Sequence, residues 1–162
     1  MKRKLTFGEV KMLSRVFDDS INYLSVRVND GSLIPATEYS MTPGNTVYMA
    51  NGSYRDDYSE STLEHRYLFV HEMAHVWQHQ RGDHVVLGAM FSRRYYYDFD
   101  KPHLSDYGIE QQASIIADYW MLKSFGIISW ASFKRYIGPF SFSDTHKIES
   151  FYQERFKYYF PK

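Results

Sequence analysis

Residues 71–75 read His-Glu-Met-Ala-His, which places two imidazoles about one helical turn apart with a carboxylate beside them. Positions i and i+4 of an α-helix lie on the same face, so His71 and His75 are spaced to bind one metal ion. Glu72 is placed to accept a proton from a metal-bound water. The pattern therefore predicts a catalytic zinc site on a helix.

Apolar residues surround the motif on most sides of this predicted helix. They are Leu68, Phe69, Val70, Met73, Ala74, Val76 and Trp77. A helix that is apolar all round is usually buried, and burying polar groups without partners costs several kcal/mol. A metal ion is the simplest partner for two buried histidines and a glutamate. The alternative is a core helix in which both histidines bond to backbone carbonyls.

The third ligand is sought among histidines and carboxylates, because the sequence contains no cysteine. Catalytic zinc usually has three protein ligands and one open position. Glu110 is the best candidate because it lies at the start of a predicted helix, where Ala113 and Ala117 permit close approach to the motif helix. The alternative is that Glu110 is an ordinary acid of a first helical turn, stabilised by the helix dipole.

Other histidines fit the third position less well. His79 lies eight residues after His71, about 12 Å along the helix axis, which is too far for both to bind one ion easily. His84 follows a glycine and could fold back toward the motif. A site of the three-histidine class, with its last histidine six residues after the motif, is excluded because that position is Arg81.

Two further roles in the site have candidates. Zinc-bound imidazoles usually donate their second N–H to a carboxylate or carbonyl, and Asp118 is predicted to reach His71 or His75 in this way. The alternative for Asp118 is a surface acid. Tyr107, or else Tyr96, could donate a hydrogen bond to an oxyanion, although a core or surface role is the alternative for each tyrosine.

The size and composition of the sequence limit the classes of protein to which it can belong. The 162 residues fit one domain, predicted to span 1–162, and can bury a core without disulfides. Nineteen basic residues balance nineteen acidic ones, so nucleic acid is a poor candidate partner. No apolar run approaches the ~20 residues of a membrane span.

The N-terminus is not expected to be a signal peptide. It starts Met-Lys-Arg-Lys, but charged residues interrupt the stretch that should be apolar. We therefore expect synthesis in the cytoplasm, where the protein either stays or leaves through a secretion apparatus that reads no leader.

Capping boxes, turns and apolar periodicity predict a mostly helical α+β fold with a small sheet near residues 32–50. The active-site helix is expected to start at a capping box of Ser61 and Glu64 and to pack against the helix that carries the third ligand. The other expected elements are a helix from Thr6 to residues 23–25, strands at 32–34 and 46–50, a short helix at 85–92, a strand-like stretch at 94–99, and helices at 107–125, capped by Ser105 or Asp106, at 129–137 and at 144–159.

Three stretches of the sequence resemble a known family. They are Asn45–Met49, Leu68–Gln80 and Tyr107–Asp118. With these residues the chain resembles zincin-type metallopeptidases of the subclass with a glutamate ligand, the gluzincins. More narrowly, it is similar to small bacterial zincin-like domains associated with contractile injection and type VI secretion systems.

The resemblance implies a zincin-like fold with Zn²⁺ as the cofactor. It implies His71, His75 and Glu110 as ligands and Glu72 as the general base. Ser114 departs from the pattern, because thermolysin-like gluzincins have an aspartate four residues after the ligand glutamate. The departure leaves open which group supports the zinc-bound histidines.

Two functions follow as hypotheses. The first is a zinc-dependent hydrolase that cleaves an amide bond in a peptide, a protein or peptidoglycan by means of metal-activated water, with Glu72 as general base. Such an enzyme could be a secreted bacterial effector, with a secretion apparatus or an immunity protein as partner. The alternative is a non-catalytic, metal-stabilised adaptor or structural module of a secretion assembly, a role that the aromatic run at 156–160 would suit.

Overall fold

Helices dominate the part of the chain that the computed structural model describes, which is residues 1–34, 39–85 and 94–162. The α-helices in these ranges are α1 (Phe7–Phe17), α2 (Leu63–Gln80), α4 (Ile109–Phe125), α5 (Ile127–Phe133) and α6 (Thr145–Phe156). The strands are β1 (Lys2–Arg3), β2 (Arg27–Asp30) and β3 (Thr46–Met49), and short 3₁₀ turns cover Tyr23–Ser25, Tyr58–Glu60 and Leu104–Asp106. The predicted α+β composition, mostly helical with a small sheet, is confirmed.

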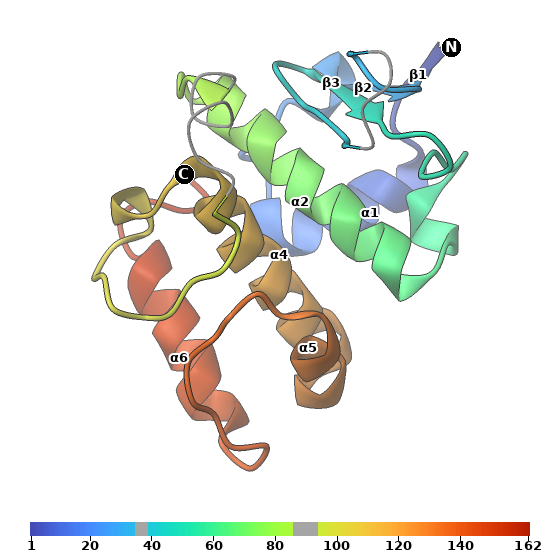
Figure 1. Cartoon of the computed structure of the whole chain (residues 1–162). Coiled ribbons are helices and arrows are strands. Elements are labelled where there is room, and N and C mark those ends of the chain that lie inside the picture. The colour runs from blue at the N-terminus through green and yellow to red at the C-terminus, as the bar shows by residue number, and fades with distance from the viewer. Residues whose placement is uncertain (35–38, 86–93) are drawn as a thin grey trace.

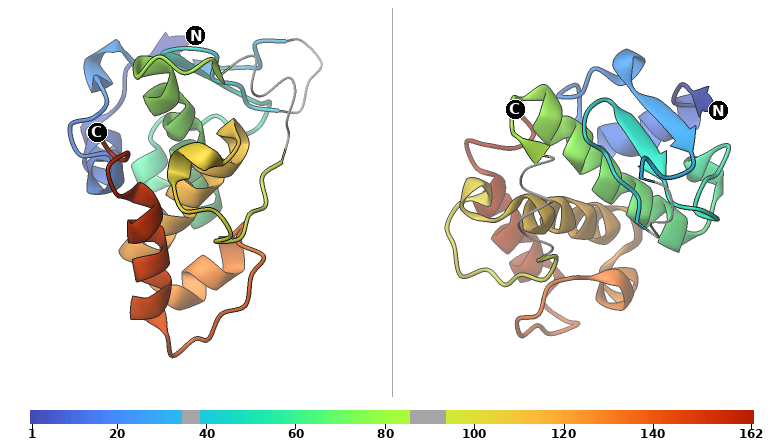
Figure 2. Two further views of the ribbon diagram at one scale, coloured as in Figure 1. Left: turned by 90° about the vertical axis from the view of Figure 1, so that its left-hand side faces the viewer. Right: turned by 45° about the horizontal axis from the view of Figure 1, so that its top comes forward.

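Helix α2 lies at the centre of the arrangement (Figure 1). It packs against β3 of the sheet and against α4, which in turn contacts α1, α5 and α6. Figure 2 shows from two further directions that the sheet and the α5–α6 part lie on opposite sides of the α2–α4 pair. The two helices predicted to carry the metal ligands are therefore in direct contact.

The sheet has the order β1-β2-β3, with β1 antiparallel to β2 and β2 parallel to β3. Val28 of β2 is opposite Val47 of β3, and both are fully buried. The strand predicted at 46–50 is confirmed, but the strand predicted at 32–34 is wrong, because β2 precedes the turn at Gly31 instead of following it. Apart from its valine, β2 consists of residues that do not favour strands, so propensity gave little sign of it.

Helix α2 contains many apolar residues because most of the helix is buried. Eleven of its eighteen residues are buried, as its apolar surroundings predicted. Its N-cap is Thr62, whose hydroxyl accepts a hydrogen bond from the backbone N–H of His65, so the cap lies one residue after the predicted box of Ser61 and Glu64. Although α2 is so deeply buried, neither it nor any other helix of the described residues is long and apolar enough to cross a membrane.

Helix α1 begins at its predicted capping box but ends earlier than expected. The hydroxyl of Thr6 accepts from the backbone N–H of Glu9, and the Glu9 carboxylate accepts from the backbone N–H of Thr6. The helix ends at Phe17 rather than at 23–25, because Asp18 adopts a φ of 48°. A positive φ is uncommon for a residue other than glycine, and it breaks the helical path here.

The segment before α4 contains less regular structure than predicted. The helix expected at 85–92 lies outside the described residues, apart from its first position. The strand-like stretch at 94–99 forms a single bridge, between Tyr97 and Tyr136, instead of a strand.

The last three helices are shorter than expected. Helix α4 follows Gly108, because the two predicted cap residues belong to the 3₁₀ turn Leu104–Asp106. Helix α5 starts and ends before the predicted 129–137, and α6 stops short of the predicted 144–159. Helix α5 ends early because the backbone N–H groups of Arg135 and Tyr136 bond to Asp118 instead of continuing the helix.

Candidate metal centre

Helices α2 and α4 bring together the three residues predicted as metal ligands. His71 and His75 come from α2 and Glu110 from the first turn of α4, and all three are buried. One donor atom of each lies within 4.8 Å of the others, and no other such group of three is found in the residues that the structure describes. The imidazole centroids of His71 and His75 are 5.1 Å apart, as expected for residues one helical turn apart.

The Glu110 carboxylate lies between the two imidazoles. Its Oε1 contacts Nε2 of His75, and its Oε2 is 3.5 Å from Nε2 of His71. Both rings therefore direct the same nitrogen toward one carboxylate. Zinc holds histidine nitrogens and carboxylate oxygens at about 2.0–2.2 Å, so tetrahedral ligands of one ion are about 3.3 Å apart. The donor types suit a zinc ion, and the three donor atoms lie close enough together for one ion to bind all of them.

When no metal is bound, Glu110 and the histidines change one another's pKa values. Burial lowers the pKa of His75, but the hydrogen bond and charge of Glu110 outweigh burial and raise that pKa to about 9. Burial raises the pKa of Glu110, yet hydrogen bonds with His71 and His75 hold it well below its ordinary range. A metal ion that binds here must displace the proton on Nε2 of His75.

Glu72, the predicted general base, is buried beside the ligands and bonded to a residue from the sheet side of α2. The hydroxyl of Thr42 donates a hydrogen bond of 2.6 Å to its Oε2. Thr42 is itself buried and follows Met41, which forms a bridge with Tyr48 of β3. The prediction from sequence missed Thr42, because nothing near it indicates a contact with a residue thirty positions later.

Asp118 does not support a ligand histidine, contrary to the prediction. Its Oδ1 accepts a 2.6 Å hydrogen bond from the hydroxyl of Tyr67, and its Oδ2 accepts one of 2.6 Å from that of Tyr97. Oδ2 also accepts from the backbone N–H groups of Arg135 and Tyr136, at 2.9 and 3.3 Å. Asp118 lies two turns beyond the ligand on α4, level with the early part of α2 rather than with its metal-binding turn.

The group that supports His75 is Gln78, on the same helix. Its Oε1 is 2.7 Å from Nδ1 of His75, and its side chain is fully buried. Residues three apart on a helix are neighbours. This local spacing is the signal from which Gln78 could have been predicted.

The tyrosine predicted to donate to an oxyanion has another role. The hydroxyl of Tyr107 donates to a backbone carbonyl of the preceding loop at 2.8 Å, so the prediction for this residue is wrong. Tyr96, the alternative to Tyr107 for this role, has a side chain that is 57% exposed. The tyrosine beside the ligands is Tyr95, whose ring centroid lies 5.9 Å from that of His71, with the guanidinium of Arg135 5.4 Å from the same tyrosine ring.

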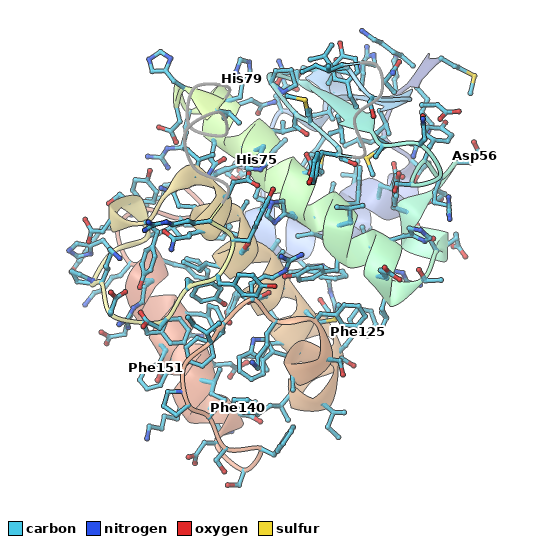
Figure 3. The ribbon with its side chains drawn as sticks, viewed as in Figure 1. Asp56, His75, His79, Phe125, Phe140 and Phe151 are labelled. Carbon is cyan, nitrogen blue, oxygen red and sulfur yellow. The ribbon has the colours of Figure 1, made fainter. Side chains whose placement is uncertain are left out.

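The other histidines weighed as ligands lie outside the group. His79 is exposed, and Figure 3 shows it further along α2 than His75, toward the C-terminal end of the helix. His84 is exposed in the segment after that helix. His79 is not one of the three residues whose donor atoms lie within 4.8 Å of one another, which agrees with the argument from its position along the helix.

Comparison with known proteins finds similarity to one bacterial secretion protein. No protein-family model matches the sequence. The type VI secretion system spike protein VgrG2b of Pseudomonas aeruginosa is 36% identical over 135 residues, which are 75% of this chain and 13% of VgrG2b. The solved structure of the effector domain of P. aeruginosa VgrG2b superposes with a TM-score of 0.68 at 36% identity, and the match covers 80% of each chain. This chain belongs to the family of that effector domain.

The family membership concerns one part of a much larger relative. The chain spans only 13% of the length of VgrG2b, and its similarity to the solved structure is to the effector domain. The structural similarity of this chain is therefore to one domain of its larger relative.

Proposed function

We propose that this chain is a zinc-dependent hydrolase that cleaves an amide bond and acts as a secreted effector of a type VI secretion system. The observation that carries the proposal is the convergence of His71, His75 and Glu110, with Glu72 buried beside them. Membership of the family of the VgrG2b effector domain supports the effector role. A zincin-like fold, with α2 as the active-site helix, is part of the proposal.

Each residue of the site has a distinct task in the proposed reaction. His71 and His75 hold the ion through Nε2, and Glu110 holds it through its carboxylate. When bound, zinc supplies a Lewis acid that lowers the pKa of water and polarises a carbonyl. Glu72 accepts a proton from the attacking water on the oxygen that Thr42 does not bond, and returns that proton to the leaving amine.

The proposed substrate is a peptide, a protein or peptidoglycan. All three contain amide bonds, and the balance of nineteen acidic and nineteen basic residues favours none of them by net charge. The proposed partners are the secretion apparatus that exports the chain and an immunity protein in the producing cell.

The test is a cleavage assay with two substrate arms and one matched variant. The purified protein is incubated with a peptide mixture and, separately, with isolated peptidoglycan, and new termini are identified by mass spectrometry. Glu72→Gln keeps the size of the side chain and removes the base. We expect it to hold as much zinc as the wild type and to cleave neither substrate.

The outcomes separate the enzyme from the alternative. Cleavage that stops with a chelator and returns with added zinc supports the hydrolase, and the arm that reacts identifies the substrate class. Full activity of Glu72→Gln would remove this residue from the mechanism. Bound zinc without cleavage in either arm would instead support a metal-stabilised, non-catalytic module.

A further inference from the structure

Gln78 joins the two helices of the candidate metal centre through a fully buried side-chain amide. Its Oε1 lies 2.7 Å from Nδ1 of His75 on its own helix. Its Nε2 donates to the backbone carbonyl of Ile109 at 3.0 Å and to Oε1 of Gln112 at 3.1 Å, both on α4. Three of the four hydrogen-bonding positions of the amide are therefore used.

The orientation of this amide is fixed by a group that can only accept. A backbone carbonyl has no hydrogen to donate, so the Gln78 atom that faces Ile109 must be the NH₂ group. The next amide is fixed in the same way, because Nε2 of Gln112 donates to the backbone carbonyl of Tyr107 at 2.8 Å. Its Oε1 must then be the atom that faces Gln78. Two carbonyls thus set the direction of the whole chain of hydrogen bonds.

The direction of these hydrogen bonds determines which nitrogen of His75 keeps its proton when a metal ion binds. The Gln78 atom that faces His75 is a carbonyl oxygen, so it accepts, and Nδ1 of His75 must donate. The ring nitrogen left for Glu110 and for a metal ion is then Nε2, which is the atom that contacts Glu110.

We infer that Gln78 is a positioning residue of the metal centre, which selects the Nδ1–H form of His75 and holds its ring for metal binding through Nε2. This inference rests on the proposed zinc site. The same side chain bonds the carbonyl of Ile109, the residue directly before Glu110, so it also holds the start of α4. One amide therefore couples a histidine ligand to the carboxylate ligand on the other helix.

A glutamine suits this role better than the carboxylate that often supports a zinc-bound histidine. A carboxylate at position 78 could accept from His75, but it could not donate to Ile109 or to Gln112. It would instead face two oxygen atoms of α4 across a buried interface, which is repulsive.

The first experiment measures zinc affinity by competition with a chromogenic chelator. Gln78→Met keeps the length of the side chain and removes its hydrogen bonds, and we expect its zinc affinity to fall by about 10- to 100-fold, the usual effect of losing a group that orients a metal ligand. The matched control is Gln80→Met on the same helix. Gln80 bonds Asn22, Ser25 and Asn45, away from the ligands, so this variant should bind zinc like the wild type.

The second experiment needs no metal. Proton exchange at the His75 ring is followed by NMR in the ¹⁵N-histidine-labelled protein with chelator present. We expect a protected Nδ1–H in the wild type and in Gln80→Met, and its loss in Gln78→Met. Gln112→Met removes the second amide but leaves the contact of Gln78 with His75, so this variant should keep the protected proton.

The two experiments separate failure of this inference from failure of the proposed function. If the wild type binds no zinc, the proposed function fails, while the NMR signal of His75 still reports the role of Gln78. A protected Nδ1–H that persists in Gln78→Met, or unchanged zinc affinity of a folded Gln78→Met protein, would overturn the inference. An equal loss of affinity in Gln112→Met would overturn it too, by assigning the effect to helix packing.

Discussion

Thr42 donates a 2.6 Å hydrogen bond from its hydroxyl to Oε2 of Glu72, and both side chains are buried. The two residues come from different segments, since Thr42 follows the residue that bridges to β3 and Glu72 lies on α2. A segment that is bridged to the sheet therefore contributes a hydrogen bond to the proposed base of the site. Thr42 engages one carboxylate oxygen, and in the proposed mechanism the other oxygen accepts the proton of the attacking water.

Thr42→Val should lower the turnover number while leaving zinc affinity unchanged. Valine has nearly the shape of threonine but cannot donate, and a hydrogen bond to a charged group contributes about 1.5–3 kcal/mol, so kcat should fall by roughly 10- to 100-fold. The measurement is kcat on the substrate found in the cleavage assay, together with zinc content.

Ser40→Ala is the matched control for this prediction. Its hydroxyl accepts from the backbone N–H of Ala50 in the same part of the chain, without touching Glu72. Activity of Thr42→Val equal to that of the wild type, or an equal loss in Ser40→Ala, would refute the role given to the threonine.

The candidate ligands could be predicted from sequence because their placement depends on local helical geometry. The spacing of His71 and His75 fixes their common face, and Glu110 was recognisable at a helix start beside small residues. The structure brings the three together on α2 and α4. The α+β class and the central position of the motif helix follow from apolar patterning in the same way.

The groups that support the ligands could not be predicted in the same way, because tertiary packing decides them. Thr42 reaches Glu72 across thirty residues, and Asp118 was assigned to a histidine although its oxygens bond two tyrosines and a backbone turn. Strand β2 was missed because it is stabilised by pairing with neighbours on both sides rather than by its own propensity.

Glu110→Gln should bind zinc far more weakly than the wild type. Loss of a group that merely orients a ligand weakens binding by about 10- to 100-fold, so loss of the anionic ligand itself should exceed about 100-fold. Glu149→Gln, a surface variant on α6, is the control and should bind normally. Chelator competition measures both affinities, and tight zinc binding by Glu110→Gln would remove this residue from the ligand set.

Removal of the metal should lower the thermal stability of the wild type. An ion that binds only the folded state stabilises it by about 2.7 kcal/mol at a free concentration 100 times its Kd. The Tm should therefore fall on addition of chelator and recover with zinc. Glu72→Gln should show the same shift, because its ligands are intact, and Glu110→Gln should show almost none. Equal Tm values with and without chelator in all three proteins would contradict this prediction.

Asp118 should make stability depend on pH in the acidic range. Burial raises its pKa to about 6, against the lowering effect of the tyrosine and backbone hydrogen bonds. Because the folded-state pKa lies above the ordinary value, the folded protein binds this proton more tightly than the unfolded chain. Protonated Asp118 stabilises the fold fully below about pH 4, and this stabilisation is lost as the pH rises through about 6. The free energy of unfolding changes by on the order of 3 kcal/mol over this range.

Asp118→Asn tests this, since asparagine does not titrate. The free energy of unfolding is measured by urea denaturation from about pH 4 to pH 7 with chelator present. Relative to the variant, the wild type should lose stability as the pH rises. A difference between the two proteins that does not change with pH would contradict the assignment. The zinc affinity of the variant should equal that of the wild type, because Asp118 bonds no ligand.

The central claim is that His71, His75 and Glu110 bind one ion together, and anomalous diffraction at the zinc edge tests it most directly. Crystals of the protein grown with zinc should show one strong anomalous peak about 2.0–2.2 Å from Nε2 of both histidines and from a carboxylate oxygen of Glu110. A protein that takes up no zinc at this place, or a peak that lies away from Glu110 on other residues, would contradict a site shared by these three ligands.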